Sequence, residues 1–261
     1  FWQQVWTFTN IRASKAADSV LTNAGQFPGA TWFDGARLNF AENLLRNRSE
    51  KLALVGRLEN GQRKTLSYAQ LNLQVANCAS SLRSLGVVCG DRVVGFMPNI
   101  IETVVAMLAT ASIGAIWSSC SPDFGVNGVM DRFGQIEPVV LFACDGYFYN
   151  GKTIDSRLRL QEVCNNIDSI KQLILVPVLS VQPDLSDLPK GILWADFLTH
   201  KSPQELVFEQ LPFDHPLYIM YSSGTTGVPK CIVHSAGGSL IQHLKEQQLH
   251  SDLQPDDVLF F

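Results

Sequence analysis

Short, almost continuously apolar segments recur through the middle of the chain, and they constrain its fold more than any other feature. They lie at residues 93–97, 139–143 and 173–176, and segments with a helical pattern separate them. A strand that is apolar at nearly every position has both faces buried, which is typical of parallel sheets. The alternation predicts an α/β fold, with a mostly parallel sheet covered by helices on both faces.

The segment 66–86 carries the clearest helix signals. Ser67 and Gln70 match a capping box, and Gly86 stands where a left-handed residue ends a helix. Apolar residues fall on one stripe of the predicted helix: Leu71, Val75, Ala79, Leu82 and Leu85. Further helices are predicted at residues 101–113 and 126–136.

The first 48 residues differ from the rest because aromatic residues are dense and no clear period is present. They include Phe1, Trp2, Trp6, Phe8, Phe27, Trp32, Phe33 and Phe40. So many aromatic side chains need apolar surface to bury against. We therefore expect an arm, residues 1–48, packed on a main domain, residues 49–261. Because the chain opens with Phe1 and ends within an apolar run at Phe261, we expect the main domain to be incomplete.

Composition excludes some classes of protein. The net charge is −4 and no long run of Lys or Arg occurs, so we expect no nucleic-acid groove. The longest apolar stretch is too short and interrupted to span a bilayer, so no integral membrane association is expected. Six cysteines without a C-x-x-C pair indicate free, buried thiols and a cytosolic location. The sequence leaves the oligomeric state open.

A loop rich in glycine and hydroxyl groups joins two apolar runs near the end of the chain. Its residues are Ser222, Ser223, Gly224, Thr225, Thr226, Gly227, Val228, Pro229 and Lys230. The two glycines allow backbone N–H groups to converge, and the hydroxyls add donors. Lys230 offers a positive charge to a polyphosphate, while Pro229 stiffens the exit. The pattern predicts a phosphate-binding loop; a plain surface turn is the alternative.

This loop differs from the G-x-x-x-x-G-K-[ST] motif of P-loop nucleotide-binding proteins. Gly227 lies three residues before Lys230, and Cys231 follows the lysine in place of Ser or Thr. An apolar strand follows as well, where the P-loop motif has a helix. A GTPase or an ordinary P-loop ATPase is therefore disfavoured.

Residues 222–230 resemble the phosphate-loop signature of the adenylate-forming superfamily, which includes acyl-CoA synthetases, luciferases and peptide-synthetase adenylation domains. Residues 37–45 resemble the N-terminal arm of short-chain acyl-CoA synthetases. Within that group, residues 121–126 and 234–246 are most similar to the branch that activates acetoacetate. The resemblance implies the N-terminal part of the large AMP-binding domain of that fold.

The resemblance also implies an activity, that of an acid–thiol ligase. Such an enzyme converts acetoacetate, ATP and coenzyme A into acetoacetyl-CoA, AMP and pyrophosphate through an acyl-adenylate, with Mg²⁺ on the phosphates. The family's adenine- and ribose-binding residues, its hinge and its catalytic lysine should lie beyond Phe261. We therefore expect no catalytic residue and no metal ligand in this chain, and no activity from the 261-residue polypeptide alone. A ligase for acetate or propionate, and a non-catalytic nucleotide-binding remnant, are the alternatives.

Two smaller features stay open at this stage. In acetyl-CoA synthetases, basic residues near the position of residues 150–152 meet the nucleotide end of coenzyme A, and here Lys152 alone is basic. Lys152 is thus a candidate coenzyme A contact, with a solvated surface lysine as the alternative. Gly237 and Gly238 allow either a helix start close to a ligand or tight packing.

Overall fold

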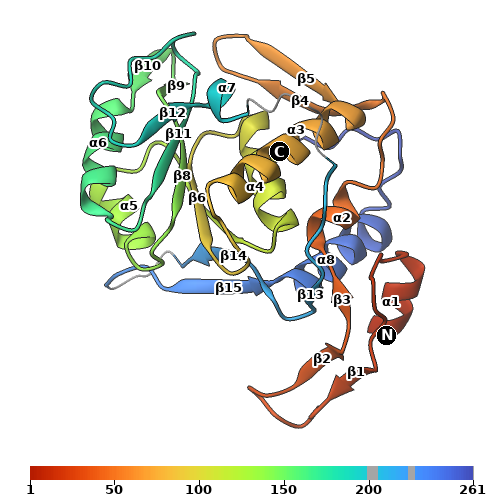
Figure 1. Cartoon of the computed structure of the whole chain (residues 1–261). Helices are drawn as coiled ribbons and strands as arrows, with labels where there is room; N and C mark the ends of the chain where they lie inside the picture. Colours follow the sequence, from red (N-terminus) through yellow and green to blue (C-terminus); the bar gives the residue numbers. More distant parts are fainter. Residues whose placement is uncertain (199–204, 223–226, 261) are drawn as a thin grey trace.

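The centre of this computed structural model, which describes residues 1–198, 205–222 and 227–260, is a seven-stranded sheet (Figure 1). Its strands are β6 (Arg92–Phe96), β7 (Ile116–Cys120), β8 (Val140–Cys144), β11 (Gln172–Val176), β12 (Gly191–Leu193), β14 (Pro216–Tyr221) and β15 (Cys231–Ser235). Their order across the sheet is β12-β11-β8-β6-β7-β14-β15. Every neighbouring pair is parallel except β14 with β15. The predicted α/β fold with a mostly parallel sheet is confirmed.

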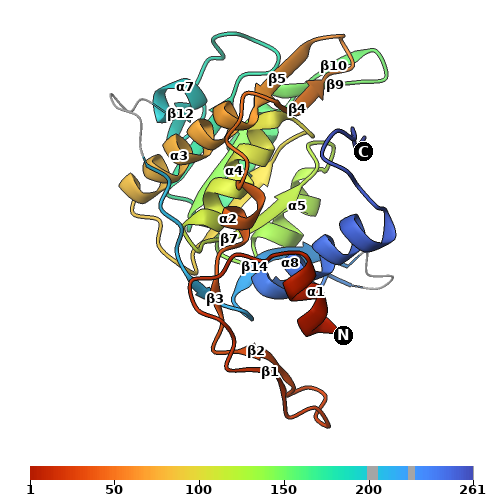
Figure 2. The same ribbon diagram turned by 90° about the vertical axis from the view of Figure 1, so that its right-hand side faces the viewer.

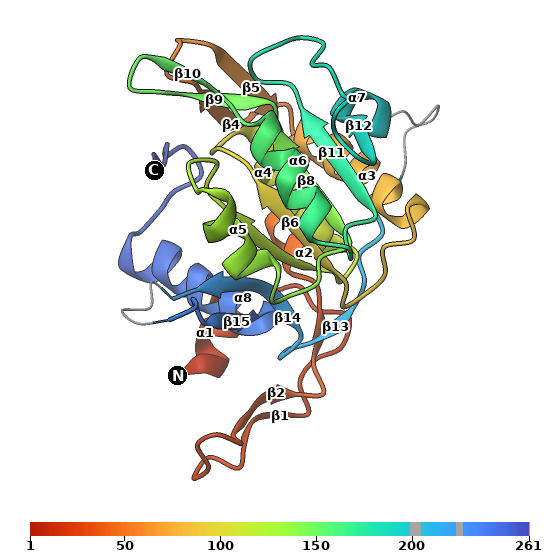
Figure 3. The same cartoon turned by 90° about the vertical axis from the view of Figure 1, so that its left-hand side faces the viewer.

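Helices cover both faces of the sheet (Figures 2 and 3). One face carries α3 (Tyr68–Ser84) and α4 (Ile101–Ser112), and the other carries α5 (Val126–Phe133) and α6 (Arg157–Asn166). Alternate strand residues enter two separate cores: Val93 and Phe142 join the first, while Val94 and Leu141 join the second. This two-sided burial is why the strands are apolar at successive positions. In the part of the chain that the structure describes, no helix is long and apolar enough to cross a membrane.

The start of α3 confirms the predicted capping box. The Gln70 N–H donates to Ser67 Oγ at 3.1 Å, and the Ser67 N–H donates to Gln70 Oε1 at 2.9 Å. Gly86 has a φ of +80°, which is the left-handed conformation expected of a helix terminator. The buried stripe ends at Leu82, and Leu85 is exposed because it lies past the last turn, so its predicted burial is wrong.

Two hairpins flank the carboxyl ends of the strands, and neither was predicted. They are formed by β4 (Leu52–Arg57) with β5 (Arg63–Ser67), and by β9 (Gly146–Tyr149) with β10 (Lys152–Asp155). Their tips meet where the Gly151 N–H donates to Glu59 Oε1 at 3.1 Å. A single helical turn, α7 (Trp194–Phe197), follows β12.

The N-terminal segment contributes buried residues to the first core, and its tip extends away (Figure 1). Its elements are α1 (Trp2–Phe8), β1 (Ser19–Thr22), β2 (Thr31–Asp34), β3 (Arg37–Leu38) and α2 (Phe40–Leu44); β3 pairs with β13 (Leu211–Pro212). Phe33 lies between Trp6 and Phe213, with both pairs of ring centroids 4.8 Å apart. Phe27, at the tip of the β1–β2 hairpin, is fully exposed. The expectation that the aromatic residues of this segment are buried is therefore wrong for Phe27.

The described cysteines are all free thiols, as the sequence predicted. Cys78, Cys120 and Cys144 are buried, and burial raises the pKa of Cys120 and of Cys144 to about 12. Cys89 is exposed, so the expectation that all these thiols are buried is wrong at that position. The elevated pKa values leave the buried thiols protonated and unreactive near neutral pH.

The last helix begins at a tight glycine contact. Helix α8 (Ala236–Lys245) continues into the π-helical turn η1 (Glu246–His250). The Gly238 N–H donates to Ser235 Oγ at 3.2 Å, which caps the helix, and a Cβ on Gly237 would lie 2.2 Å from the ring of Phe213. The glycine pair therefore serves capping and packing, which answers the question left open by the sequence.

We predict that Gly237→Ala destabilises the protein. Alanine gains about 1 kcal/mol of helix propensity, but overpacking against a buried ring costs about 1–3 kcal/mol and Phe213 has little room to move. Thermal unfolding should show a lower Tm for Gly237→Ala. Gly25→Ala is the control, because a Cβ there would meet nothing within 4 Å. Equal Tm values for the two variants would contradict the packing role.

Candidate functional site

The loop at residues 222–230 is closed at its base by the pairing of β14 with β15. Tyr221 and Cys231 are the last paired residues of the two strands. One step further, the Ser222 N–H donates to the Lys230 carbonyl at 3.0 Å, and the Lys230 N–H donates to Ser222 Oγ at 3.2 Å. The strand ladder thus extends into the loop and fixes where the loop begins and ends.

The predicted phosphate-binding residues fall partly in this base. Ser222, Gly227, Pro229 and Lys230 are described, whereas the other four lie outside the described residues: Ser223, Gly224, Thr225 and Thr226. Gly227 has a φ of +87°, a conformation that favours glycine. Lys230 is exposed, and none of the described acidic side chains forms an ion pair with it. Its ammonium is therefore available to an anion.

The entry to the loop rests on β7 and α5. The hydroxyls of Tyr221 and Ser118 are hydrogen-bonded at 3.0 Å, and Ser118 Oγ also donates to the Ile219 carbonyl at 2.8 Å. Burial raises the pKa of Tyr221 well above its usual value, so the phenol stays protonated. The guanidinium of Arg132 lies 5.7 Å from the Tyr221 ring and 4.6 Å from the Phe124 ring. These contacts attach the last residue before the loop to a buried strand and a helix.

A second group of basic and aromatic residues lies at the start of α5. Arg159 Nη1 donates to the carbonyls of Pro122 (2.8 Å) and Phe124 (3.3 Å), and its guanidinium lies 5.8 Å from the Tyr147 ring. Lys152 is exposed on the same β9–β10 hairpin as Tyr147. Arg157 is partly neutralised, because it pairs with Asp155 at 2.6 Å. This pairing lowers the pKa of Asp155.

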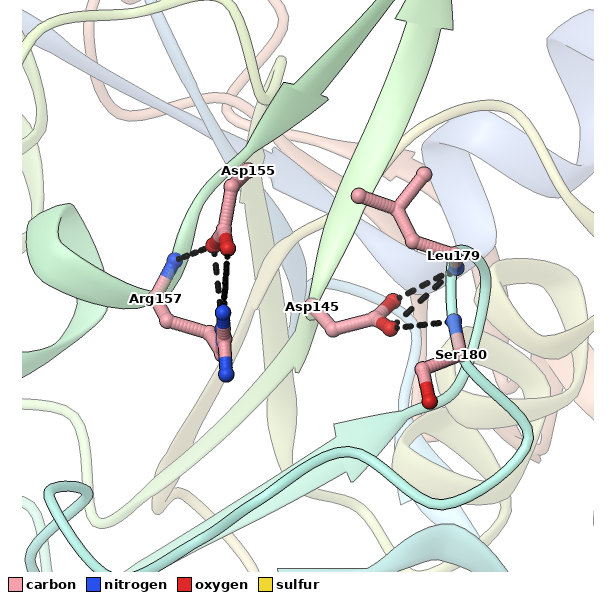
Figure 4. A network of polar contacts seen from close by, with 5 residues as sticks. All are labelled: Asp145, Asp155, Arg157, Leu179 and Ser180. Carbon is pink, nitrogen blue, oxygen red and sulfur yellow. Dashed lines mark hydrogen bonds and ion pairs between the residues drawn. The ribbon is translucent and has the colours of Figure 1, made fainter.

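The carboxylate of Asp145 holds the backbone of residues 178–180, which follow β11 (Figure 4). Asp145 is buried directly after β8 and accepts hydrogen bonds from three consecutive backbone N–H groups. These are Val178 to Oδ1 at 2.7 Å, Leu179 to Oδ1 at 3.0 Å and Ser180 to Oδ2 at 2.9 Å. A buried carboxylate fully used by backbone donors is a structural anchor, so Asp145 fixes the segment that follows β11.

One cavity of the described structure lies away from the loop. It has a volume of about 360 Å³ and is bounded by the β4–β5 hairpin, the first residues of α4 and the segment after β11. Within it, Lys64 forms an ion pair with the buried Glu102. None of the loop residues 222 and 227–230 lines this cavity, so we base no part of the candidate site on it.

Comparison with known proteins identifies the class of protein to which these features belong. The model of the AMP-binding enzyme family matches residues 40–261, and the chain belongs to that family. The resemblance to adenylate-forming enzymes, based on the loop and on the flanking motifs, is confirmed.

Relatives narrow the class further. The chain is 48% identical to acetoacetyl-CoA synthetase from Macaca fascicularis, over 99% of this chain and 40% of that protein. It is 43% identical to malonamoyl-CoA synthetase vrtB from Penicillium aethiopicum, over 100% of this chain and 38% of that protein. The structure of acetoacetyl-CoA synthetase from Streptomyces lividans superposes with a TM-score of 0.92 at 44% identity, covering 98% of this chain and 39% of that one. The chain thus spans about two fifths of the length of these relatives.

Sequence reasoning missed three residues of the site region. Arg132 and Arg159 lie within helices, where the sequence pattern of a single arginine indicates only a solvent-exposed charge. Gln135 lies in a turn that belongs to no recognised motif. Some of their contacts join distant positions: Arg159 and Phe124 are 35 residues apart, and Gln135 and Pro229 are 94 residues apart. No local pattern encodes such contacts; only the folded sheet brings these residues together.

We predict that Asp145→Asn lowers the free energy of unfolding by about 2–4 kcal/mol, because an amide nitrogen would face backbone donors that the carboxylate now satisfies. Urea denaturation should measure the loss. Asp184→Asn is the control, since Asp184 is exposed and bonds only locally, to Ser186. A loss no larger than that of the control would refute the anchoring role of Asp145.

Proposed function

We propose that this chain supplies the ATP phosphate loop and the surrounding subdomain of an acetoacetate–CoA ligase. The reaction joins acetoacetate to coenzyme A and cleaves ATP to AMP and pyrophosphate, through an acyl-adenylate. The observation that carries the proposal is the loop base, where Ser222 and Lys230 close a glycine-rich loop and leave an exposed ammonium. No acidic side chain in the described part of the chain forms an ion pair with it. The family membership and the names of the relatives support it.

In this proposal the loop residues hold the β- and γ-phosphates while a carboxylate attacks the α-phosphorus. Lys230 contributes charge, and hydroxyls and backbone N–H groups contribute donors from six other loop residues: Ser222, Ser223, Gly224, Thr225, Thr226 and Gly227. Pro229 has no N–H to donate and stiffens the exit of the loop. Mg²⁺ bound to ATP screens phosphate charge. Among residues 1–198, 205–222 and 227–260, no group of three or more acidic, His or Cys side chains could hold a metal, so we assign no magnesium ligand here.

We further propose that the nucleotide end of coenzyme A binds near the start of α5. Lys152 offers a charge on the β9–β10 hairpin, and Arg159 adds a second charge that no carboxylate neutralises among the described ion pairs. The Tyr147 ring beside Arg159 offers a stacking surface. The two basic groups lie on consecutive elements, Lys152 on β10 and Arg159 on α6.

The identity of the carboxylic acid substrate is proposed from the names of the relatives. Acetoacetate and malonamate are short acids of nearly the same shape, because both carry a carbonyl group two bonds from the carboxyl carbon. The two relative names therefore favour a short 3-oxo acid, with acetoacetate first and malonamate as the second candidate. Residues 1–48 would then be the N-terminal arm and residues 49–261 part of the AMP-binding domain. A cytosolic location fits the free thiols.

We predict that Lys230→Met weakens ATP binding at least about tenfold. The substitution removes the charge but keeps an apolar stem, and a charge-assisted hydrogen bond contributes about 1.5–3 kcal/mol. Isothermal titration of a full-length protein containing this chain with ATP should measure the change. Lys171→Met is the matched control, because Lys171 is exposed just before β11, which neighbours the edge strand β12 on the opposite side of the sheet. An unchanged affinity of Lys230→Met for ATP would contradict the phosphate-binding role of the loop.

We predict that a full-length protein containing this chain prefers short 3-oxo acids. Carboxylate-dependent exchange of pyrophosphate into ATP should be fastest with acetoacetate, slower with malonamate and slowest with acetate and propionate. The 261-residue polypeptide alone is the control and should give no exchange, because it spans only about 40% of the relatives. A preference for acetate or propionate would overturn the acid assignment without touching the ATP assignment.

A further inference from the structure

One side chain, Gln135, contacts both chain neighbours of Lys230. Gln135 Nε2 donates to the Pro229 carbonyl at 2.9 Å. On the other side of the lysine, Cys231 Sγ donates to Gln135 Oε1 at 3.8 Å. Both polar ends of one amide are therefore used to hold the two residues that flank the exposed ammonium.

The Gln135 side chain is itself fixed. Gln135 lies two residues after α5, and its Nε2 also donates to the carbonyl of Asp131 in that helix. This local bond limits the rotamers of Gln135, so less entropy is lost when it engages Pro229 and Cys231. The backbone of Lys230 is held from the other side by Ser222.

The same helix supports the entry to the loop. Arg132 is three residues before Gln135 and contacts the ring of Tyr221, the last residue of β14. Figure 3 shows α5 beside the β14–β15 pair. The entry and the exit of the loop therefore both rest on the end of α5, although the loop itself joins two strands.

We propose that Gln135 is a positioning residue for Lys230: it fixes the exit of the loop so that the ammonium is presented to the phosphates of ATP. This inference rests on the proposed role of the loop. Gln135 is not proposed to touch the nucleotide. A lysine whose flanking residues are already ordered loses less freedom on binding, so the affinity for the anion is higher.

The test compares Gln135→Glu and Gln135→Ala. Gln135→Glu keeps the size of the side chain, but a carboxylate cannot donate to the Pro229 carbonyl. Gln172→Glu is the matched control, because Gln172 Nε2 also donates to a backbone carbonyl, that of Lys190, at a position remote from the loop. Gln135 is exposed, so the variants should keep the Tm of the parent chain.

Two quantities are measured on each variant, made in a full-length protein that contains this chain. The first is hydrogen exchange of a peptide covering residues 228–231 without nucleotide, and the second is the affinity for ATP by titration. Losing the hydrogen bond to the Pro229 carbonyl, which both Gln135 variants lack, should speed exchange and weaken ATP binding by about three- to tenfold. Gln172→Glu should change neither.

Each possible result either supports or contradicts the positioning role of Gln135. Unchanged exchange in Gln135→Glu and Gln135→Ala would overturn the positioning role. Faster exchange with unchanged ATP affinity would also overturn it, provided that Lys230→Met does weaken ATP binding. If ATP affinity is unchanged in the Lys230 variant too, the proposed function of the loop fails, while faster exchange still supports the anchoring of Lys230 by Gln135.

Discussion

Burial of the central sheet on both faces is the constraint on which the rest of the structure depends. Helices occupy the two faces, so polar groups that must reach a ligand can gather only at the edges and at the ends of the strands. The basic group near Arg159 and the anchor Asp145 lie just beyond strand carboxyl ends, and the loop before Lys230 lies beyond the end of β14. The positions of the candidate site therefore follow from the layering of the fold.

Helix α5 connects the two candidate substrate regions. Its first residue follows Gly125, next to the carbonyls that Arg159 engages, and its far end supplies the contacts to the phosphate loop. Eight residues of α-helix span about 12 Å. In the proposed ligase, a short rigid element would thus hold the coenzyme A end and the ATP end at a set separation.

Sequence patterns correctly predicted the structural features that interactions between neighbouring residues determine. The capping box of α3, the terminator Gly86 and the buried strands were all correct, because a few neighbouring residues determine each of them. The β4–β5 and β9–β10 hairpins were missed, because their strands alternate too weakly to stand out. Site residues were predicted only where a continuous motif exists, as at Lys230. Gln135 and Arg159 acquire their roles from partners far away along the chain, which no local motif records.

The reversed direction of β15 has a consequence for the N-terminal segment. Since β15 runs antiparallel to β14, it returns the chain from the loop to the amino-terminal edge of the sheet, where α8 starts. There α8 packs against α1 and α2, and Gly237 lies close to Phe213, whose ring contacts that of Phe33. The N-terminal residues thereby stabilise the position of β15, the strand that leaves the loop. In the proposed ligase, a substitution in that distant segment would therefore act on the strand that leaves the loop without altering any residue of the loop itself.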